Sequence, residues 1–197
     1  MAHAIVQARM LSTRLPGKVA KSIGPFETLL EYLIMRVKCS SYIEEITIAT
    51  TDSSEDDLVE SICNNLSVSC YRGDNHDVLS RYIGAAKNSP QKVIVRITGD
   101  CPLICPEILD KAINHYLTGQ YDYVSNCLPS TYPDGLDVEV FSKELLEEAG
   151  KSCKSFKDRE HVTKWMQRTK RIIKGNIEHT QDLSNIRLTV DEKEDLK

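Results

Sequence analysis

A loop near the N-terminus gathers residue types that bind phosphate. Residues 7–18 read QARMLSTRLPGK and hold the cations Arg9, Arg14 and Lys18 with no acidic residue. The whole chain has a formal net charge of -4, so this local positive charge predicts a site for a small polyanion. The hydroxyl of Ser12 and the free backbone N–H groups around it are the usual further donors of a phosphate cradle. The alternative is a solvated loop with scattered cations.

Two aspartates each follow an apolar run that predicts a buried strand. Asp100 comes soon after residues 92–97, and Asp191 directly after residues 186–190. A carboxylate just past the end of such a strand lies where open α/β sheets bind ligands. Near a phosphate loop it fits Mg²⁺, which takes one or two protein carboxylates and completes its shell with phosphate oxygens and water. The alternatives are a local Asx turn at Asp100 and a plain acidic surface around Asp191.

A third cluster comprises Gly73, Asp74, Asp77 and Arg81. Asp77 and Arg81 are four residues apart in a helix predicted over 76–87, so they share one helix face. The spacing by itself favours a surface ion pair, which contributes little stability. The functional alternative is recognition of a nucleobase or ribose by the loop and the first helical turn.

Polar residues in the second half of the chain occupy positions where the rim of a pocket is expected. Asp137 and Glu139 enter a predicted strand, and Arg159 and His161 open a helix predicted over 158–168. The two basic residues are suited to holding an anionic second substrate. The alternative is that the aspartate at the start of this helix is its N-cap and that both basic side chains are solvated.

Hydrophobic periodicity gives the elements that must position these groups. Buried strands are predicted at 4–6, 45–50, 67–71 and 92–97, and amphipathic helices at 28–38, after the serines at 53 and 54, at 76–87 and at 106–116. The second of these helices is expected to bury Leu58, Val59 and Ile62. Four strand–helix repeats predict a mostly parallel central sheet with helices on both faces, an α/β class, and right-handed crossovers.

The second half of the chain is less regular. Strands are predicted at 121–124, 136–141, 171–177 and 186–190, the second of them half-exposed, and helices at 143–149 and 158–168. We predict one domain over residues 1–197 with a mixed second half. Its part from about 120 to 180 is expected to form a smaller lobe or a dimer arm, because the exposed strands need cover.

Composition excludes several classes of protein. The chain is 41% apolar and 27% charged, which is typical of globular proteins. It has neither an apolar stretch long enough to cross a bilayer nor the pattern of a signal peptide, so we expect a cytoplasmic protein with no membrane partner. Seven cysteines without a regular framework are interpreted as reduced thiols, and zinc is disfavoured. The low net charge argues against nucleic acid as a partner.

Taken together, the motifs resemble the cytidylyltransferases of the acylneuraminate and 3-deoxy-manno-octulosonate type, and most closely the branch of spore-coat polysaccharide biosynthesis proteins. The similar stretches follow the family order over nearly the whole chain. They are QARM and STRLPGK in residues 7–18, DVL with RY in 77–82, ITGDCPLI in 97–104, GLDVEVF in 135–141, REHVT in 159–163, and TVDE with EDL in 189–196.

This resemblance implies a Rossmann-like nucleotide-diphospho-sugar transferase fold. It implies transfer of CMP from CTP to a nonulosonic-type acidic sugar, with release of pyrophosphate, in surface polysaccharide biosynthesis, with Mg²⁺ as the cofactor. The residues implied as catalytic are Arg9, Arg14, Lys18 and Asp100. Those implied to bind the nucleotide are Ala8, Arg9, Ser12, Arg14, Lys18, Gly73, Asp77, Arg81, Thr98 and Gly99. Those implied to bind the sugar are Asn126, Asp137, Glu139, Arg159 and His161, and the metal ligands are Asp100 and Asp191.

Three features depart from the family pattern. Leu11 stands where such loops usually have glycine, so it is expected to crowd the phosphate or to forbid a positive φ. Cys105 stands where aspartate is frequent, and the chain stops at Lys197, where a helix normally follows. Two other functions stay open: a nucleotidyltransferase with a non-sugar acceptor, and a non-catalytic nucleotide- or sugar-binding module. A homodimer is possible.

Overall fold

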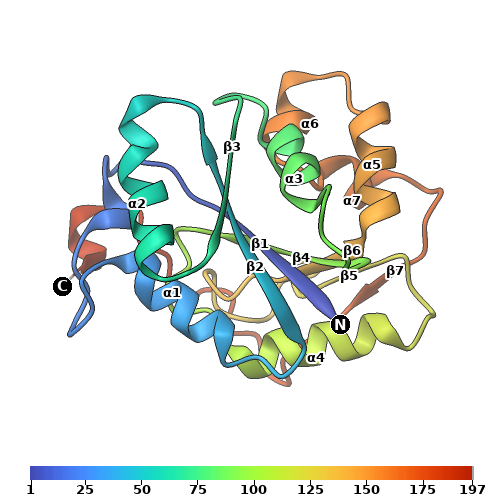
Figure 1. Ribbon diagram of the computed structural model, residues 1–197. Coiled ribbons are helices and arrows are strands. Elements are labelled where there is room, and N and C mark those ends of the chain that lie inside the picture. Colours follow the sequence, from blue (N-terminus) through green and yellow to red (C-terminus); the bar gives the residue numbers. More distant parts are fainter. Residues whose placement is uncertain (197) are drawn as a thin grey trace.

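The computed structural model describes residues 1–196, whose seven strands form one sheet (Figure 1). The strands are β1 (Ala2–Gln7), β2 (Ile43–Thr51), β3 (Ser69–Gly73), β4 (Val93–Thr98), β5 (Tyr123–Ser125), β6 (Glu139–Ser142) and β7 (Lys174–Asn176). Their order in the sheet is β3-β2-β1-β4-β6-β5-β7. β6 runs antiparallel to its neighbours β4 and β5, and the other pairs are parallel. The predicted α/β class with a mostly parallel sheet is confirmed.

Helices cover both faces of the sheet, as the strand–helix alternation predicts (Figure 1). The α-helices are α1 (Leu29–Lys38), α2 (Asp57–Asn65), α3 (Val78–Ala86), α4 (Pro106–Leu117), α5 (Lys143–Ser152), α6 (Phe156–Glu160) and α7 (Lys164–Arg168). Three short 3-10 helices are η1 (Lys18–Ala20), η2 (Ser54–Asp56) and η3 (Lys193–Leu196). α1, α2 and α4 pack on one face, whereas α3, α5 and α7 pack on the other.

The central strand β1 separates two hydrophobic cores. Ala4 and Val6 belong to the core under α1, α2 and α4, and Ile5 belongs to the core under α3 and α5, because successive side chains of a strand point to opposite faces. All three side chains are completely buried. Full burial of an aliphatic side chain such as Ile5 stabilises a fold by roughly 1.5–3 kcal/mol. This strand therefore holds the two helical layers, and the loop that follows it, in a fixed relation.

The structure corrects one helix and one strand of the second half. The helix predicted over 158–168 is two short helices, α6 and α7, because buried Val162 between them has a φ of 54°. Ser155, not Asp158, caps α6, since the serine hydroxyl accepts from the Asp158 N–H. Residues 186–190 form no strand and contribute only an isolated bridge between Asp134 and Arg187.

Two burial predictions are also wrong. Leu58 is 47% exposed, whereas Val59 and Ile62 of the same helix are buried. The strand near 136–141 was expected to be half-exposed, but β6 is buried at Glu139, Val140 and Phe141. β6 lies between β4 and β5, and Val140 and Phe141 belong to the cores on opposite faces of the sheet. Both faces of β6 are therefore covered, and polar side chains on it must find partners inside the protein.

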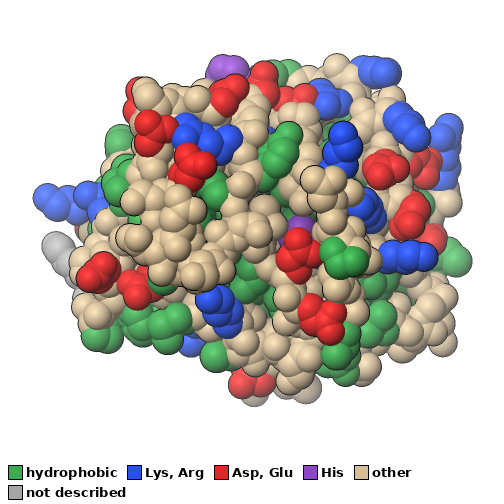
Figure 2. Space-filling view, viewed as in Figure 1, with side chains coloured by type: hydrophobic (Ala, Val, Ile, Leu, Met, Phe, Trp, Pro, Cys, Tyr) green, Lys and Arg blue, Asp and Glu red, His purple; other side chains and the backbone are tan. Residues whose placement is uncertain are grey.

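The segment from 120 to 180 supplies β5, β6 and β7 to the same sheet as β1 to β4. The association of two copies through this segment stays a prediction. Within residues 1–196, none of the helices has the length and apolar character needed to span a membrane. Figure 2 shows acidic and basic side chains interspersed on the viewed face, with several lysines and arginines at its right-hand edge.

Candidate functional site

The loops after β1 and β4 meet because these two strands are neighbours in register. Gln7 at the end of β1 lies opposite Thr98 at the end of β4. The Gly99 N–H donates to the Gln7 carbonyl at 2.8 Å, and a Cβ on Gly99 would lie 2.7 Å from that oxygen. Only glycine allows the two chains to approach so closely. The turn at Gly99 thus aims the following residues towards the loop at 8–18.

A cleft of about 240 Å³ opens between these loops. It is lined by Gln7, Ala8, Arg9, Ser12, Thr13, Arg14, Lys18, Val19, Thr98, Gly99, Asp100 and Asp191. Nine of the predicted catalytic, nucleotide-binding and metal-binding residues are thereby brought together, although they come from three distant parts of the chain. In Figure 1 the C-terminal segment lies beside the N-terminal loop, where Arg14 Nη2 is 2.9 Å from Asp191 Oδ1.

Lys18 joins the two aspartates from inside the cleft wall. Its side chain is buried, and its Nζ lies 2.9 Å from Asp191 Oδ1 and 3.5 Å from Asp100 Oδ2. The same ammonium donates to the Val190 carbonyl at 2.8 Å. The left-handed conformation of Gly17, with a φ of 72°, turns the chain into η1 at this point. One cation therefore fixes the separation of two carboxylates that are 91 positions apart in the sequence.

The electrostatics of Asp100 favour its ionised form. Burial raises the pKa of this carboxyl, but the charge of Lys18 and the hydroxyl of Thr98 outweigh that effect, and the pKa is held below its ordinary value. Asp100 and Asp191 are then two hard oxygen donors on one side of a cationic cleft. This donor set fits Mg²⁺, which needs few protein ligands when phosphate oxygens and water complete its octahedron.

The backbone of the loop keeps several donors open. The Met10 carbonyl accepts from the N–H groups of Ser12 at 2.9 Å and Gly17 at 2.7 Å, and so closes the loop on itself. Within residues 1–196, the N–H groups of Arg9, Leu11, Thr13 and Arg14 donate to no protein acceptor. Unpaired N–H groups on a cationic loop are the donors that bind phosphate oxygens in many nucleotide sites.

A second hollow of about 170 Å³ continues the cleft past Arg9. It is lined by Gln7, Ala8, Arg9, Val78, Arg81, Glu160 and His161. Arg81 is 2% exposed, and its Nη1 donates to the carbonyls of Asp74 at 2.7 Å and Asn75 at 3.1 Å. Its buried Nε has no hydrogen-bond partner among residues 1–196. Burial lowers the pKa of the guanidinium. An arginine in this state is suited to contact a polar ligand in the hollow.

Two residues predicted to bind the nucleotide instead support this hollow. Asp77 caps α3 by accepting from the Ser80 N–H, and its other oxygen lies 2.6 Å from Arg159 Nε. The surface ion pair between Asp77 and Arg81 suggested by their spacing is therefore not formed, because Arg81 turns to backbone carbonyls. Gly73 ends β3, and a Cβ on it would lie 3.3 Å from the Arg81 side chain. Gly73 thus lies against the Arg81 side chain, and Asp77 fixes the start of the helix that carries it.

Three of the five residues predicted to bind the sugar are occupied by protein contacts. Asn126 is completely buried and bonds the Leu136 carbonyl and the Val138 N–H, both at 2.8 Å. Glu139 is 3% exposed and is bound by Arg96, the Tyr123 hydroxyl and Gln167. Arg159 bonds Asp77 and the carbonyls of Gly150 and Cys153. All three are correctly polar but serve the fold, since buried polar groups must be paired.

The other two predicted acceptor residues remain accessible. Asp137 is half-buried, and burial together with the charges of Asp134 and Glu139 raises its pKa to about 6. His161 is exposed and lines the second hollow, on the nucleotide side rather than at a separate sugar pocket. Asp137 is thus the acidic candidate for the acceptor side, and the assignment of His161 to the sugar is not supported by its position.

The departures at Leu11 and Cys105 do not obstruct the cleft. In the described part of the chain, the non-glycine residues with positive φ are Ser67 and Val162, so Leu11 has an ordinary backbone conformation. Its side chain lines a neighbouring hollow of about 260 Å³ instead of the phosphate cleft. Cys105 occupies the N-cap position of α4, and its thiol donates to Glu107 at 2.9 Å. The loop therefore needs no positive φ at Leu11, and crowding of the phosphate by its side chain stays a prediction.

Sequence reasoning missed the residue that holds the turn at Asp191. Asp195 Oδ2 accepts from the N–H groups of Asp191 and Glu192, each at 2.8 Å, and the carboxylate pairs with Arg187 at 2.6 Å. These backbone bonds, followed by the Arg187 pairing, lower the pKa of Asp195. The sequence signals were its place in the EDL stretch of the resemblance and an acid four positions after an aspartate, which is also what a solvated acidic surface looks like.

The sequence matches a known family and known relatives over almost its whole length. The model of the family described as "Cytidylyltransferase" matches residues 3–195. An uncharacterized protein of Methanocaldococcus jannaschii is 39% identical over 98% of this chain and 79% of that protein. The spore coat polysaccharide biosynthesis protein SpsF of Bacillus subtilis is 34% identical over 97% of this chain and 81% of its own.

Solved structures agree with these relatives. A cytidylyltransferase from Leptospira borgpetersenii superposes with a TM-score of 0.93 at 37% identity, covering 98% of this chain and 82% of that one. CMP:2-keto-3-deoxy-manno-octonic acid synthetase, solved in complex with CTP, has a TM-score of 0.70 at 15% identity over 97% and 93% of the two chains, and so shares the fold. The chain therefore belongs to the cytidylyltransferase family and is a nucleotidyltransferase.

Proposed function

We propose that this enzyme transfers CMP from CTP to an acidic sugar, of the nonulosonic type, and releases pyrophosphate, in the synthesis of a surface polysaccharide. The observation that carries this proposal is the cleft in which Lys18 lies between Asp100 and Asp191 beneath a cationic loop. Support for CTP comes from the family and from the relative that was solved with CTP. Support for the polysaccharide comes from the similarity to SpsF.

The loop holds the triphosphate. Arg9, Arg14 and Lys18 supply positive charge, and the unpaired N–H groups between them donate to phosphate oxygens. The nucleoside then extends into the hollow beside Arg81, whose buried guanidinium donates to the base or the ribose. Lys18 is held by two carboxylates before substrate arrives, so it needs little reorganisation to stabilise the charge of the transition state.

The chemical step is an in-line displacement at the α-phosphorus. The sugar hydroxyl oxygen forms the new bond to phosphorus, and the bond from phosphorus to the bridging α,β-oxygen breaks. The electron pair leaves with pyrophosphate, and the hydroxyl proton passes to solvent. Arg14 and Lys18 offset the negative charge that develops on the leaving group. The chain contributes mainly positioning and charge neutralisation rather than covalent chemistry.

Asp100 and Asp191 are the residues that would hold Mg²⁺. When bound, this ion polarises phosphate oxygens and lowers the pKa of a coordinated hydroxyl. The low pKa of Asp100 keeps that carboxylate available as a ligand at neutral pH. Arg14 pairs with Asp191 in the structure described above, and its exposed side chain would be free to turn to phosphate oxygens if Asp191 held a divalent cation.

A direct assay tests the proposal. Pyrophosphate release is measured with CTP, Mg²⁺ and a panel of acceptors that includes acidic sugars, neutral sugars, polyols and phosphonates. We expect release with CTP rather than the other nucleoside triphosphates, and with an acidic sugar. Turnover with a polyol or phosphonate alone would replace the sugar assignment. Tight binding of CTP with no turnover for any acceptor would favour a non-catalytic binding module.

A further inference from the structure

We propose that Asp56, which lies outside the cleft, is the positioning residue that holds the phosphate loop in its binding conformation. The loop is residues 8–18, and Asp56 lies behind it with 1% of its surface exposed. Its Oδ1 accepts from the Met10 N–H at 2.6 Å, and its Oδ2 accepts from the Thr51 N–H at 3.1 Å and from the Thr51 hydroxyl. The inference rests on the proposed function, because it assigns a role to this loop in binding CTP.

The bonding of Asp56 is unusual for a buried carboxylate. Its partners are neutral donors, and no ion pair within residues 1–196 includes it. Burial of an ionised carboxylate without a paired cation is unfavourable, and the hydrogen bonds must offset that cost. A helix start needs only a short polar cap, so capping of α2 does not account for this arrangement. The side chain forms no capping bond there.

The contacts of Asp56 connect the loop to a rigid part of the sheet. Thr51 is the last residue of β2, and Met10 is the residue at which the loop closes on itself. One carboxylate thus connects the end of β2 to Met10, the residue at which the loop closes on itself. The Met10 N–H donates to Asp56 behind the loop. Within residues 1–196 the N–H groups of Leu11 and Thr13 have no protein acceptor, so they remain available for phosphate.

The charge of Asp56 has a second consequence for the nucleotide site. The Nη1 of buried Arg81 donates to backbone carbonyls and, within residues 1–196, pairs with no carboxylate. Burial lowers the pKa of its guanidinium. The negative charge of Asp56 acts on this guanidinium in the opposite direction and favours its charged form. An asparagine at position 56 would therefore weaken both the loop contact and the electrostatic support of Arg81.

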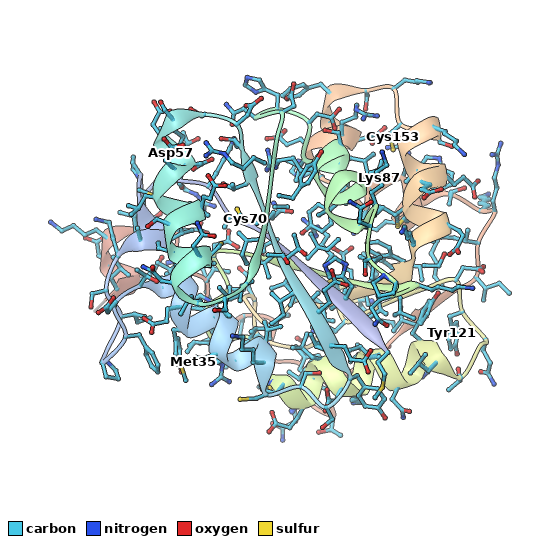
Figure 3. All side chains as sticks on the ribbon, in the orientation of Figure 1. Met35, Asp57, Cys70, Lys87, Tyr121 and Cys153 are labelled. Carbon is cyan, nitrogen blue, oxygen red and sulfur yellow. The ribbon has the colours of Figure 1, made fainter. Side chains whose placement is uncertain are left out.

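The chain offers a matched control beside Asp56. Asp57 is the next residue, carries the same charge and begins the same helix, but its side chain is 67% exposed and pairs with Arg72. In Figure 3 its side chain projects from the start of α2 at the outside of the molecule. Asp57→Asn changes the net charge and the helix start in the same way as Asp56→Asn, without touching the loop.

The test compares Asp56→Asn with Asp57→Asn by calorimetric titration of CTP and of pyrophosphate, and by steady-state kinetics. An asparagine has one acceptor oxygen and an NH₂ donor, so it cannot offer one oxygen to the Met10 N–H and another to the Thr51 N–H as the carboxylate does. We expect Asp56→Asn to weaken CTP binding and raise the KM for CTP by about 10- to 100-fold. The KM for the acceptor and the affinity of Asp57→Asn for CTP should stay within about twofold of wild type.

A second variant separates positioning from general stability. Thr51→Val removes one donor to Asp56 but leaves the Met10 contact in place. We expect it to lower the unfolding midpoint while CTP affinity changes by less than about threefold. If Thr51→Val weakens CTP as much as Asp56→Asn does, the effect follows stability and the proposal is overturned. CTP affinity of folded Asp56→Asn equal to that of wild type would also overturn it.

Amide hydrogen exchange of the wild-type protein gives a measurement that needs neither a variant nor turnover. We expect the Met10 amide to exchange at least about tenfold more slowly than the amides of Leu11 and Thr13. Equal exchange rates for the three amides would refute the proposed role of Asp56 even if Asp56→Asn failed to fold. Failure of wild type to bind CTP would instead overturn the proposed function, whereas slow Met10 exchange would still support the contact between Asp56 and the loop.

Discussion

The phosphate side and the acceptor side of the site use their polar residues in opposite ways. On the phosphate side, Arg14, Lys18 and Asp100 face a cleft. On the acceptor side, Asn126 and Glu139 are buried and bonded within the protein. Both groups look alike in the sequence, as charged or amide residues beside apolar runs. A polar residue near the edge of a sheet therefore indicates a ligand site only when the fold leaves its polar atoms open.

Strand direction explains the difference. Asp100 follows the carboxyl end of β4, which runs parallel to β1, so it projects past the edge where the loops converge. Glu139 is the first residue of β6, which runs antiparallel to β4, and it lies directly opposite Arg96 within the ladder. A cross-strand pair of opposite charge on a covered face is bonded internally. The same residue type thus changes role with the direction of its strand.

The largest effect that separates the two sides is expected at Asp100. Asp100→Asn removes the proposed magnesium ligand from the cleft, and we expect turnover to fall on the order of 10³-fold, comparable with loss of a group that stabilises the transition state. The unfolding midpoint should change little, since the side chain is partly exposed and bonded at 3.5 Å to Lys18. The measurement is initial-rate pyrophosphate release with circular dichroism as the check of folding. Retention of more than a tenth of the activity would contradict the assignment.

At Glu139 we expect the reverse of the result at Asp100: a substitution should lower the stability of the fold and leave substrate binding unchanged. Glu139→Gln leaves the Arg96 guanidinium without its ion pair, and we expect a loss of about 3 kcal/mol in the free energy of unfolding in urea. The exposed Glu148→Gln is the control and should change it by less than about 0.5 kcal/mol. The KM for the acceptor should not change in the folded enzyme. A stable variant with a tenfold higher acceptor KM would restore Glu139 to the sugar site.

The pH dependence of that loss has a defined sign. Burial raises the pKa of Glu139, but Arg96 and the other donors hold it below its ordinary value near 4.5. A lowered pKa in the folded state means that the stabilisation is complete above pH 4.5 and is lost as the pH falls further. The difference in stability between wild type and Glu139→Gln should therefore be constant at neutral pH and shrink in acid.

A smaller effect of the opposite sign is expected at Asp137. Its raised pKa of about 6 means that the folded protein favours the protonated carboxyl. Stability from this group is therefore greatest at low pH and falls as the pH rises from 3.8 to about 6. Asp137→Asn should increase the free energy of unfolding by about 1 kcal/mol at pH 7, with no gain below pH 4. Urea unfolding at pH 4, 5, 6 and 7 measures this, and a pH-independent difference would contradict it.

The smallest effect is expected at Leu11, on the phosphate side itself. Because its backbone is ordinary and its side chain lines the neighbouring hollow, Leu11→Gly should change kcat/KM for CTP by less than about threefold. The kinetics of pyrophosphate release test this directly, with Leu11→Ala separating the effect of the side chain from that of backbone freedom. A gain of tenfold or more would show that the native loop is impaired by leucine.

Much of the fold and about half of the site could be predicted from the sequence. The apolar runs ending at Val6 and Ile97, with glycine and charged residues after each, place the phosphate loop and Asp100 at one sheet edge, because parallel strands bring their carboxyl ends together. The cation excess of the loop against a net charge of -4 predicts the kind of ligand. These features are local, and local periodicity and composition are what a sequence displays.

The tertiary structure alone decided which polar residues are free. It paired Asp77 with Arg159 across 82 positions, bonded Asp56 to Met10 across 46, and brought Asp191 to Lys18 across 173. The physical reason is that a buried polar group must be satisfied by whatever donor the folded chain brings near it, and that donor comes from a distant segment whose identity no local pattern encodes.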